Sequence, residues 1–232
     1  MAHRGWSSRA PENTLAAIQL AAQEDRIDSI EMDVQLSKDG VPIIFHDFSV
    51  ERTTNGTGLV KDFTFRELQQ LDAGSWFSSR FKGERVPSLE EVFIELKGKQ
   101  TMVNLEIKTA GEMYPGIENK VVSLIEQLRM EDVVTLTSFD HQVIYRVKML
   151  APNVETGLLF YGNPTLVNEQ LAYTGSTVVS IAHEFLTKEF VAKRDASKII
   201  AWTVNTKEEV DAVKRLSNEI VICSNYPELL FT

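Results

Sequence analysis

Short apolar runs alternate with longer amphipathic runs along most of this chain. The apolar runs are rich in valine, isoleucine and leucine and have the length of β-strands. We expect strands at residues 1–3, 29–36, 41–45, 101–108, 133–138, 155–160, 177–181, 198–204 and 219–223. If 41–45 is treated as a continuation of the second strand, about eight central strands remain.

The segments between these strands place apolar residues on one face at helical spacing. They predict helices at 14–23, 89–96, 117–128, 142–150, 166–172, 188–195 and 208–216. Alternation of strands and helices is typical of a parallel sheet covered by helices. Periodicity alone does not separate a closed barrel from an open, doubly wound sheet.

One stretch, from about residue 47 to residue 87, breaks this alternation. It is rich in glycine, threonine, asparagine and charged residues and has only weak strand signals. So long an irregular segment in a compact domain is usually functional or a small insertion. The chain has no internal repeat, low-complexity tract or linker. We therefore expect a single domain over residues 1–232, with an insertion at about 47–87.

Composition narrows the class of partner. Hydrophobic residues make up 43% of the 232 residues, and the formal net charge is −9. Such an acidic chain without a polybasic segment is expected to bind nucleic acid and anionic membranes poorly.

The sequence also lacks recognisable targeting segments. No apolar run approaches the ~18 residues of a membrane span, and no signal peptide is recognisable. The single cysteine, Cys223, lies in an apolar run and is expected to be a buried structural thiol. We expect a cytoplasmic protein.

Three acidic residues occupy strand positions where carboxylates are costly. Glu31 and Asp33 are two residues apart, so they project from the same face of their strand, and Glu106 lies between apolar residues of another. On an edge strand such acids would simply face solvent. In a barrel, inward residues at the C-terminal strand ends line the active-site mouth. Carboxylates that converge there need a cation, and oxygen ligands favour Mg²⁺ or Ca²⁺ over zinc.

Two of the four histidines end predicted strands. His3 closes the first strand and His46 closes the run 41–45. Histidine titrates near neutrality, so one ring could take a proton while the other gives one. A structural role is the alternative for each taken singly. His141 is expected to begin a helix, and His183 to follow a strand away from substrate.

Two cations stand beside these groups. Arg4 follows His3, and Lys108 lies two residues after Glu106, on the same strand face. Lys108 is suited to pair with a carboxylate, to bind phosphate, or to do both, whereas Arg4 could clamp a phosphate or be an ordinary surface residue. The sequence has no P-loop, no nucleotide-binding glycine fingerprint and no Gly-x-Ser-x-Gly elbow.

These residues belong to short motifs in a fixed order. The motifs are His3-Arg4-Gly5, Pro11-Glu12-Asn13-Thr14, Glu31-Met32-Asp33-Val34, Phe45-His46-Asp47 with 52–58, 86–91, 104–108, Ser138-Phe139 and Trp202-Thr203-Val204-Asn205. Each is weakly specific alone. The ordered set, which spans nearly the whole chain, resembles the glycerophosphodiester phosphodiesterase family.

The resemblance implies a TIM (β/α)8 barrel with a small insertion after the second strand. It implies hydrolysis of small glycerophosphodiesters to sn-glycerol 3-phosphate and an alcohol. It also implies roles for nine residues: a divalent metal ion, Mg²⁺ or Ca²⁺, on Glu31, Asp33 and Glu106, acid and base catalysis by His3 and His46, phosphate binding by Arg4 and Lys108, and substrate contacts from Phe139 and Trp202.

The residues also allow two other functions. Aromatic residues could line an apolar approach for lysophospholipids, which would make the protein lysophospholipase D-like; the candidates are Phe45, Trp76, Phe77, Phe139 and Trp202. Phe45 is the one most easily read as core. A barrel that only binds a phosphorylated ligand is a further alternative, although it would have no use for two histidines.

The chain departs from the family pattern near its end. The family's late Thr-Asp-x-Pro appears here as Ser224-Asn225-Tyr226-Pro227, and little chain follows it. Any substrate contact from this loop is therefore left open. The preferred ion, the head group, the choice between attack by water and by the substrate's own hydroxyl, and the oligomeric state are not determined by the sequence.

Overall fold

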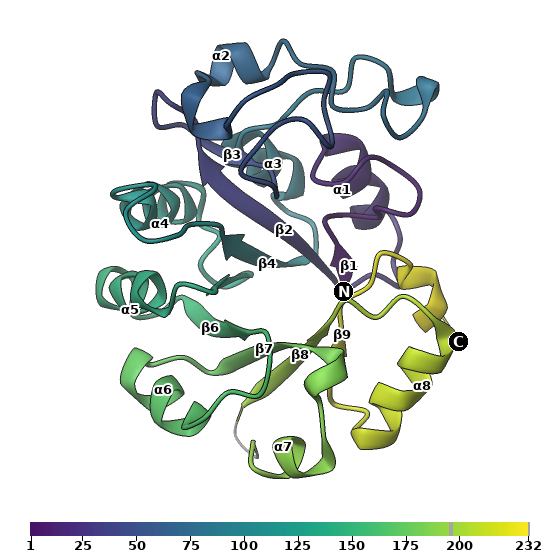
Figure 1. Ribbon diagram of the computed structural model, residues 1–232, viewed down its shortest axis with the longest axis vertical. Helices are drawn as coiled ribbons and strands as arrows, with labels where there is room; N and C mark the ends of the chain where they lie inside the picture. The colour runs from purple at the N-terminus through teal and green to yellow at the C-terminus, as the bar shows by residue number, and fades with distance from the viewer. Residues whose placement is uncertain (195–196, 232) are drawn as a thin grey trace.

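The computed structural model describes residues 1–194 and 197–231. Within these residues, eight parallel strands follow one another in chain order, and Figure 1 shows helices around the outside of them. The strands are β1 (Ala2–His3), β2 (Ser29–Leu36), β4 (Met102–Ile107), β5 (Val134–Ser138), β6 (Glu155–Phe160), β7 (Val178–Ala182), β8 (Lys198–Trp202) and β9 (Val221–Ile222).

The two ends of the sheet meet. Ala2 forms a parallel bridge with Ser224, just after β9. The backbone N–H of His3 donates to the Ser224 carbonyl at 2.9 Å, and the N–H of Ser224 donates to the Met1 carbonyl at 3.2 Å. The expected TIM-type barrel is therefore present, and its seam joins the first and last strands.

Strand β3 (Pro42–Ile44) runs beside β2 instead of extending it. The pairing is antiparallel, with Val34 opposite Ile44. The chain reverses at Gly40, whose φ of +77° suits a residue without a side chain. The expectation that 41–45 continues the second strand is therefore corrected to a hairpin on the outside of the barrel, and the eight central strands are complete without it.

Helices of the expected kind cover the sheet. They are α1 (Leu15–Ala22), α3 (Leu89–Leu96), α4 (Ile117–Leu128), α5 (His141–Leu150), α6 (Val167–Thr174), α7 (Lys188–Ala192) and α8 (Lys207–Leu216). Helix α7 is shorter than the expected 188–195, and residue 195 lies outside the described residues. Hydroxyl side chains begin many of them: Thr14, Ser88 and Thr206 each accept a hydrogen bond from a backbone N–H of the first turn.

Strand β2 places apolar side chains against the helices and polar side chains in the barrel interior. All eight of its residues are buried, yet apolar and polar types alternate. Ile30, Met32 and Val34 belong to the apolar core that includes residues of α1, α3 and α4. Glu31 and Asp33 point the opposite way because successive side chains of a strand alternate between its faces. The helices thus cover one face while the carboxylates face the barrel interior.

Between β3 and α3 the described chain forms only short helical pieces. They are η1 (Val60–Asp62), α2 (Phe65–Leu68) and η2 (Ser79–Phe81). This segment packs with β3 around its own small apolar cluster, which includes Phe45, Val50, Val60 and Leu68. Figure 1 shows it above the β2–β3 hairpin. The division into one domain with an insertion stays a prediction.

No helix in the described residues is long and apolar enough to cross a membrane. The cytoplasmic location expected from the sequence stays a prediction.

Candidate active site

A cavity opens among the C-terminal ends of the strands, the end at which TIM barrels carry their active sites. Of the nine residues to which the family resemblance gave roles, all except Asp33 line it. Asp33 lies 3.5 Å from the Arg4 guanidinium and 3.9 Å from the Nζ of Lys108. The lining comprises His3, Arg4, Glu31, His46, Asn104, Glu106, Lys108, Phe139, Leu159, Ser180, Ile200, Trp202, Thr203 and Cys223.

The three carboxylates converge as their strand positions indicated. Asp33 lies opposite Glu106 in the pairing of β2 with β4. One carboxylate oxygen from each of Glu31, Asp33 and Glu106 lies within 4.8 Å of the others, and all three residues are buried. Burial and the neighbouring carboxylates raise the pKa of Glu31 well above its usual value and that of Glu106 to about 7.

Asp33 behaves differently from its two neighbours. Burial alone would raise its pKa, but the charges of Arg4, His46 and Lys108 outweigh burial and lower it. Asn13 also donates a hydrogen bond to Asp33 at 2.8 Å. Asp33 is therefore the carboxylate that the protein itself keeps ionised, whereas Glu31 and Glu106 resist ionisation together. A hard divalent cation held by these oxygens would relieve that repulsion, so the donor set fits Mg²⁺ or Ca²⁺.

Arg4 is fixed by a tight loop after β1. Its φ is +57°, and Gly5 follows with φ +78°; a Cβ on Gly5 would lie 2.6 Å from the Ala17 backbone. The Arg4 backbone N–H donates to Glu31 at 3.0 Å, and its guanidinium donates to Glu12 at 2.7 Å. The close approach of this loop to α1, which only glycine allows, therefore sets the position of Arg4.

Lys108 joins the carboxylates to a histidine. Its Nζ lies 3.0 Å from a Glu106 oxygen and 3.2 Å from Nε2 of His46. Burial would lower the pKa of Lys108, but the Glu106 and Asp33 charges outweigh burial and raise it. Lys108 therefore remains a cation inside the cavity.

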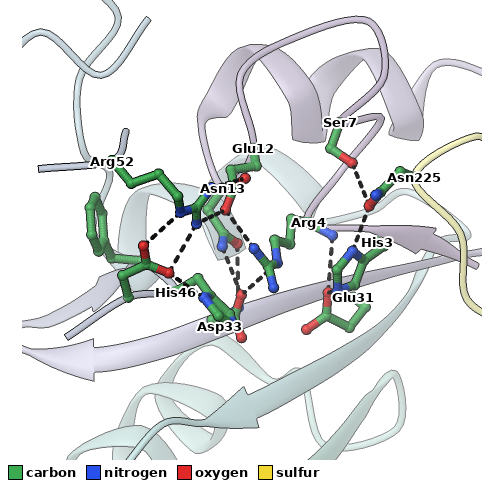
Figure 2. Close-up of polar contacts among 12 residues, drawn as sticks. His3, Arg4, Ser7, Glu12, Asn13, Glu31, Asp33, His46, Arg52 and Asn225 are labelled. Atoms are coloured by element: carbon green, nitrogen blue, oxygen red, sulfur yellow. Dashed lines mark hydrogen bonds and ion pairs between the residues drawn. The ribbon is translucent and has the colours of Figure 1, made fainter. Parts of the chain in front are cut away.

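A network of charged side chains that was not predicted from the sequence holds His46 in place. Its Nδ1 lies 2.6 Å from an Asp47 oxygen, and Arg52 binds Asp47 on one side and Glu12 on the other, with four donor–acceptor distances of 2.6–3.0 Å. Figure 2 shows Arg52 reaching toward Glu12, which also binds Arg4. The signals available in the sequence were the position of Asp47 next to His46 and the place of Arg52 at the start of the motif 52–58; neither indicated that the two side chains pair.

His3 lies on the opposite side of the carboxylates. Only 14% of its side chain is exposed, and its Nε2 lies 3.8 Å from a Glu31 oxygen. Its Nδ1 lies 2.6 Å from the side-chain oxygen of Asn225, a partner that the sequence also left unassigned (Figure 2). Burial and the nearby Arg4 charge lower the pKa of His3 to about 4, so its ring is neutral at neutral pH.

One rim of the cavity is aromatic. Phe139 packs edge-on against Trp202 with ring centroids 5.7 Å apart, and the Nζ of Lys108 lies 5.9 Å from the Phe139 ring. Tyr161 lies 6.3 Å from Trp202 and 5.3 Å from Phe185, which extends the aromatic surface away from the polar groups. This rim offers an apolar surface next to the proposed phosphate site.

The other aromatic candidates lie elsewhere. Phe45 is 5% exposed and belongs to the apolar cluster beside β3, as a core residue would. Trp76 packs edge-on with Phe77, and neither is among the described residues that line the cavity. The expected aromatic approach therefore keeps Phe139 and Trp202 but not these three residues.

Three further residues, to which the sequence assigned no catalytic role, are Cys223, His141 and His183. Cys223 lines the cavity but is buried, and burial raises the pKa of its thiol well above the usual value. His141 is the first residue of α5 and packs on Phe160. His183 follows β7 and lies near two glutamates. Neither histidine is among the described residues that line the cavity.

Comparison with known proteins identifies the family. The model of the glycerophosphoryl diester phosphodiesterase family matches residues 3–228. The chain belongs to this family. Its members are hydrolases, and the site is that of an enzyme.

Individual relatives match this chain over nearly their full length. A glycerophosphodiester phosphodiesterase from Caldanaerobacter subterraneus is 40% identical over 235 residues, covering 99% of this chain and 95% of the relative. A phosphodiesterase structure from Oleispira antarctica, in complex with the product sn-glycerol-3-phosphate, superposes with a TM-score of 0.93 at 32% identity, covering 100% and 96% of the two chains. A glycerophosphodiester phosphodiesterase structure from Agrobacterium tumefaciens gives 0.80 at 30% identity, covering 98% and 96%.

Proposed function

We propose that this protein hydrolyses small glycerophosphodiesters to sn-glycerol 3-phosphate and an alcohol at a divalent-metal site. The observation that carries the proposal is the convergence, in one cavity, of three buried carboxylates, two cations and two oriented histidines. The family match and the product held by the Oleispira antarctica relative support the same substrate class.

The residues divide the chemistry between them. A divalent ion held by Glu31, Asp33 and Glu106 would polarise a phosphoryl oxygen and offset negative charge. Arg4 and Lys108 bind the non-bridging oxygens and stabilise the charge that grows on them. Attack on phosphorus by water breaks the bond to the alcohol oxygen and gives sn-glycerol 3-phosphate directly. Attack by the substrate's own glycerol hydroxyl breaks the same bond but gives a cyclic glycerol phosphate, which water then opens to sn-glycerol 3-phosphate. One of His3 and His46 takes the proton of the attacking hydroxyl, and the other protonates the departing oxygen.

The decisive experiment is an assay of purified protein with glycerophosphocholine. We expect release of sn-glycerol 3-phosphate with at least one of Mg²⁺, Ca²⁺ and Mn²⁺, and loss of that release on addition of EDTA. Excess metal added after the chelator should restore turnover, which separates metal removal from unfolding. If no product forms with any of the three ions, the proposed function is wrong.

A second candidate is lysophospholipase D-like hydrolysis, which the aromatic rim favours. Tyr161 is 71% exposed and Phe139 44% exposed, so an acyl chain could lie along them. We nevertheless expect a higher kcat/KM for glycerophosphocholine than for lysophosphatidylcholine, because the polar groups that hold the phosphate are buried and the exposed rings lie beyond them.

Parallel turnover of the two substrates checks this expectation. Tyr161→Ala serves as the comparison variant, since Tyr161 is outside the residues that line the cavity. It should leave glycerophosphocholine turnover unchanged. A preference of the native enzyme for the lipid, lost in Tyr161→Ala, would establish the lysophospholipase activity instead.

A further inference from the structure

The segment after β9 covers the loop that follows β1. The Ser8 backbone N–H donates to the Asn225 carbonyl at 3.1 Å. The indole N–H of Trp6 donates to Glu228 at 2.8 Å, and Arg9 lies 3.7 Å from the same carboxylate. The two ends of the chain are thus fastened together beside the cavity.

Asn225 adds a contact of another kind, because it reaches a proposed catalytic residue. Its side-chain oxygen lies 2.6 Å from Nδ1 of His3 and accepts a hydrogen bond from the Ser7 hydroxyl at 3.1 Å. Figure 2 shows Asn225 on the side of the His3 ring away from Arg4 and Asp33. The Asn225 backbone is itself held, since its N–H donates to the Asn205 side chain at 3.0 Å.

The consequence for His3 follows from the chemistry of a neutral imidazole. One ring nitrogen donates and the other accepts, and the hydrogen bond at one nitrogen decides which is which. A carbonyl-type oxygen at Nδ1 requires the proton there. Nε2, 3.8 Å from Glu31, then keeps its lone pair on the cavity side.

We infer that Asn225 is a positioning residue, which fixes the ring orientation and tautomer of His3 so that Nε2 faces the reacting group. This inference rests on the proposed function. It explains why an asparagine can stand where the family pattern has an aspartate: either side chain presents an oxygen to Nδ1–H. Partners that orient a ligating or catalytic imidazole typically change activity by about 10–100-fold when removed.

The test compares two substitutions that differ in that oxygen. Asn225→Leu keeps the approximate size but removes the acceptor, whereas Asn225→Asp retains it. With glycerophosphocholine and the activating metal, we expect Asn225→Leu to lower kcat by about 10–100-fold with KM changed by less than about threefold. Asn225→Asp should keep kcat within about fivefold of the native enzyme.

A matched control separates positioning from loop anchoring. Glu228→Leu removes the tie to Trp6 without touching Asn225, so it should lower the melting temperature while kcat stays within about threefold. In a His3→Ala background, Asn225→Leu should cause no further loss, because the two residues act as a unit. Equal losses in Asn225→Leu, Asn225→Asp and Glu228→Leu, or additive losses in the double variant, would overturn the inference.

A spectroscopic measurement covers the case in which Asn225→Leu does not fold. The chain has four histidines, so ¹⁵N-histidine labelling of the native protein with Mg²⁺ should resolve the His3 ring. We expect its proton on Nδ1; a proton on Nε2 contradicts the inference. An inactive native enzyme would count against the proposed function, whereas an active native enzyme whose kcat is unchanged in Asn225→Leu counts only against the role of Asn225.

Discussion

Replacement of His46 by alanine is expected to lower kcat for glycerophosphocholine by at least about 100-fold, the usual contribution of a positioned acid or base. The ring is held by Asp47 through Nδ1 at 2.6 Å, and its Nε2 lies 3.2 Å from Lys108 in the cavity. Alanine removes the proton carrier but few packing contacts, because the His46 side chain is 28% exposed. Circular dichroism should therefore show a folded protein.

His3→Ala should reduce kcat to a similar degree, because attack and departure each need a proton carrier. His183→Ala is the control, since His183 lies outside the cavity and its loss should leave kcat within about twofold. Steady-state kinetics at saturating metal provides the measurement. A folded His46→Ala or His3→Ala enzyme with near-native turnover would remove that histidine from the mechanism.

Glu106→Gln is expected to have the second large effect. It should weaken activation of the enzyme by metal, and it should stabilise the metal-free protein against unfolding. Loss of a carboxylate ligand should weaken metal activation about 10-fold or more. In metal-free protein the same change should raise stability, because burial and neighbouring charge disfavour the ionised form of Glu106. We expect a gain in the free energy of unfolding of about 1–3 kcal/mol near pH 8.

The pH dependence follows from the raised pKa. Glu106 ionises near pH 7 in the folded protein, against a usual value of 4.5. The folded state therefore holds a proton that the unfolded state has lost, and metal-free stability falls as the pH rises from about 4.5 to 7. The gain in the free energy of unfolding of Glu106→Gln over the native protein should be complete above pH 7 and should vanish below about pH 4.5.

Thermal unfolding in EDTA across this range, and metal titration of activity, measure the two halves of the prediction. Glu219→Gln is a suitable control, because this exposed glutamate lies away from the site. An unchanged metal titration would show that Glu106 is not a ligand. A lower melting temperature in EDTA would show that the ion pair with Lys108 outweighs the cost of burial.

Much of the site could be predicted because it lies on β-strands, in which successive side chains point to opposite faces. The spacing of Glu31 and Asp33 placed both on one face of β2, and the same reasoning placed Lys108 beside Glu106. Register between strands was not available from the sequence, so the approach of Glu106 to Asp33 became visible only in the structure. The direction of β3 was missed for a similar reason, because an apolar run does not indicate whether a strand is parallel or antiparallel to its neighbour.

The supporting residues were harder to predict than the reacting ones. Arg52 meets Asp47 and Glu12 through the path of an irregular segment, which no periodicity describes. Asn225 approaches His3 across 222 positions of sequence, and its departure from the family pattern had left any contact from this loop open. The side-chain oxygen that asparagine shares with aspartate is the feature on which the role inferred for Asn225 rests.

The seam between the first and last strands has a consequence for biosynthesis. A ribosome releases His3, Arg4 and Glu31 long before Asn225, so early strands can pair while the cavity lacks one wall. Contacts of such sequence separation form late and slow folding. A nascent or C-terminally shortened chain would therefore carry most of the polar residues in place and still lack a finished site, which ties catalytic competence to completed synthesis.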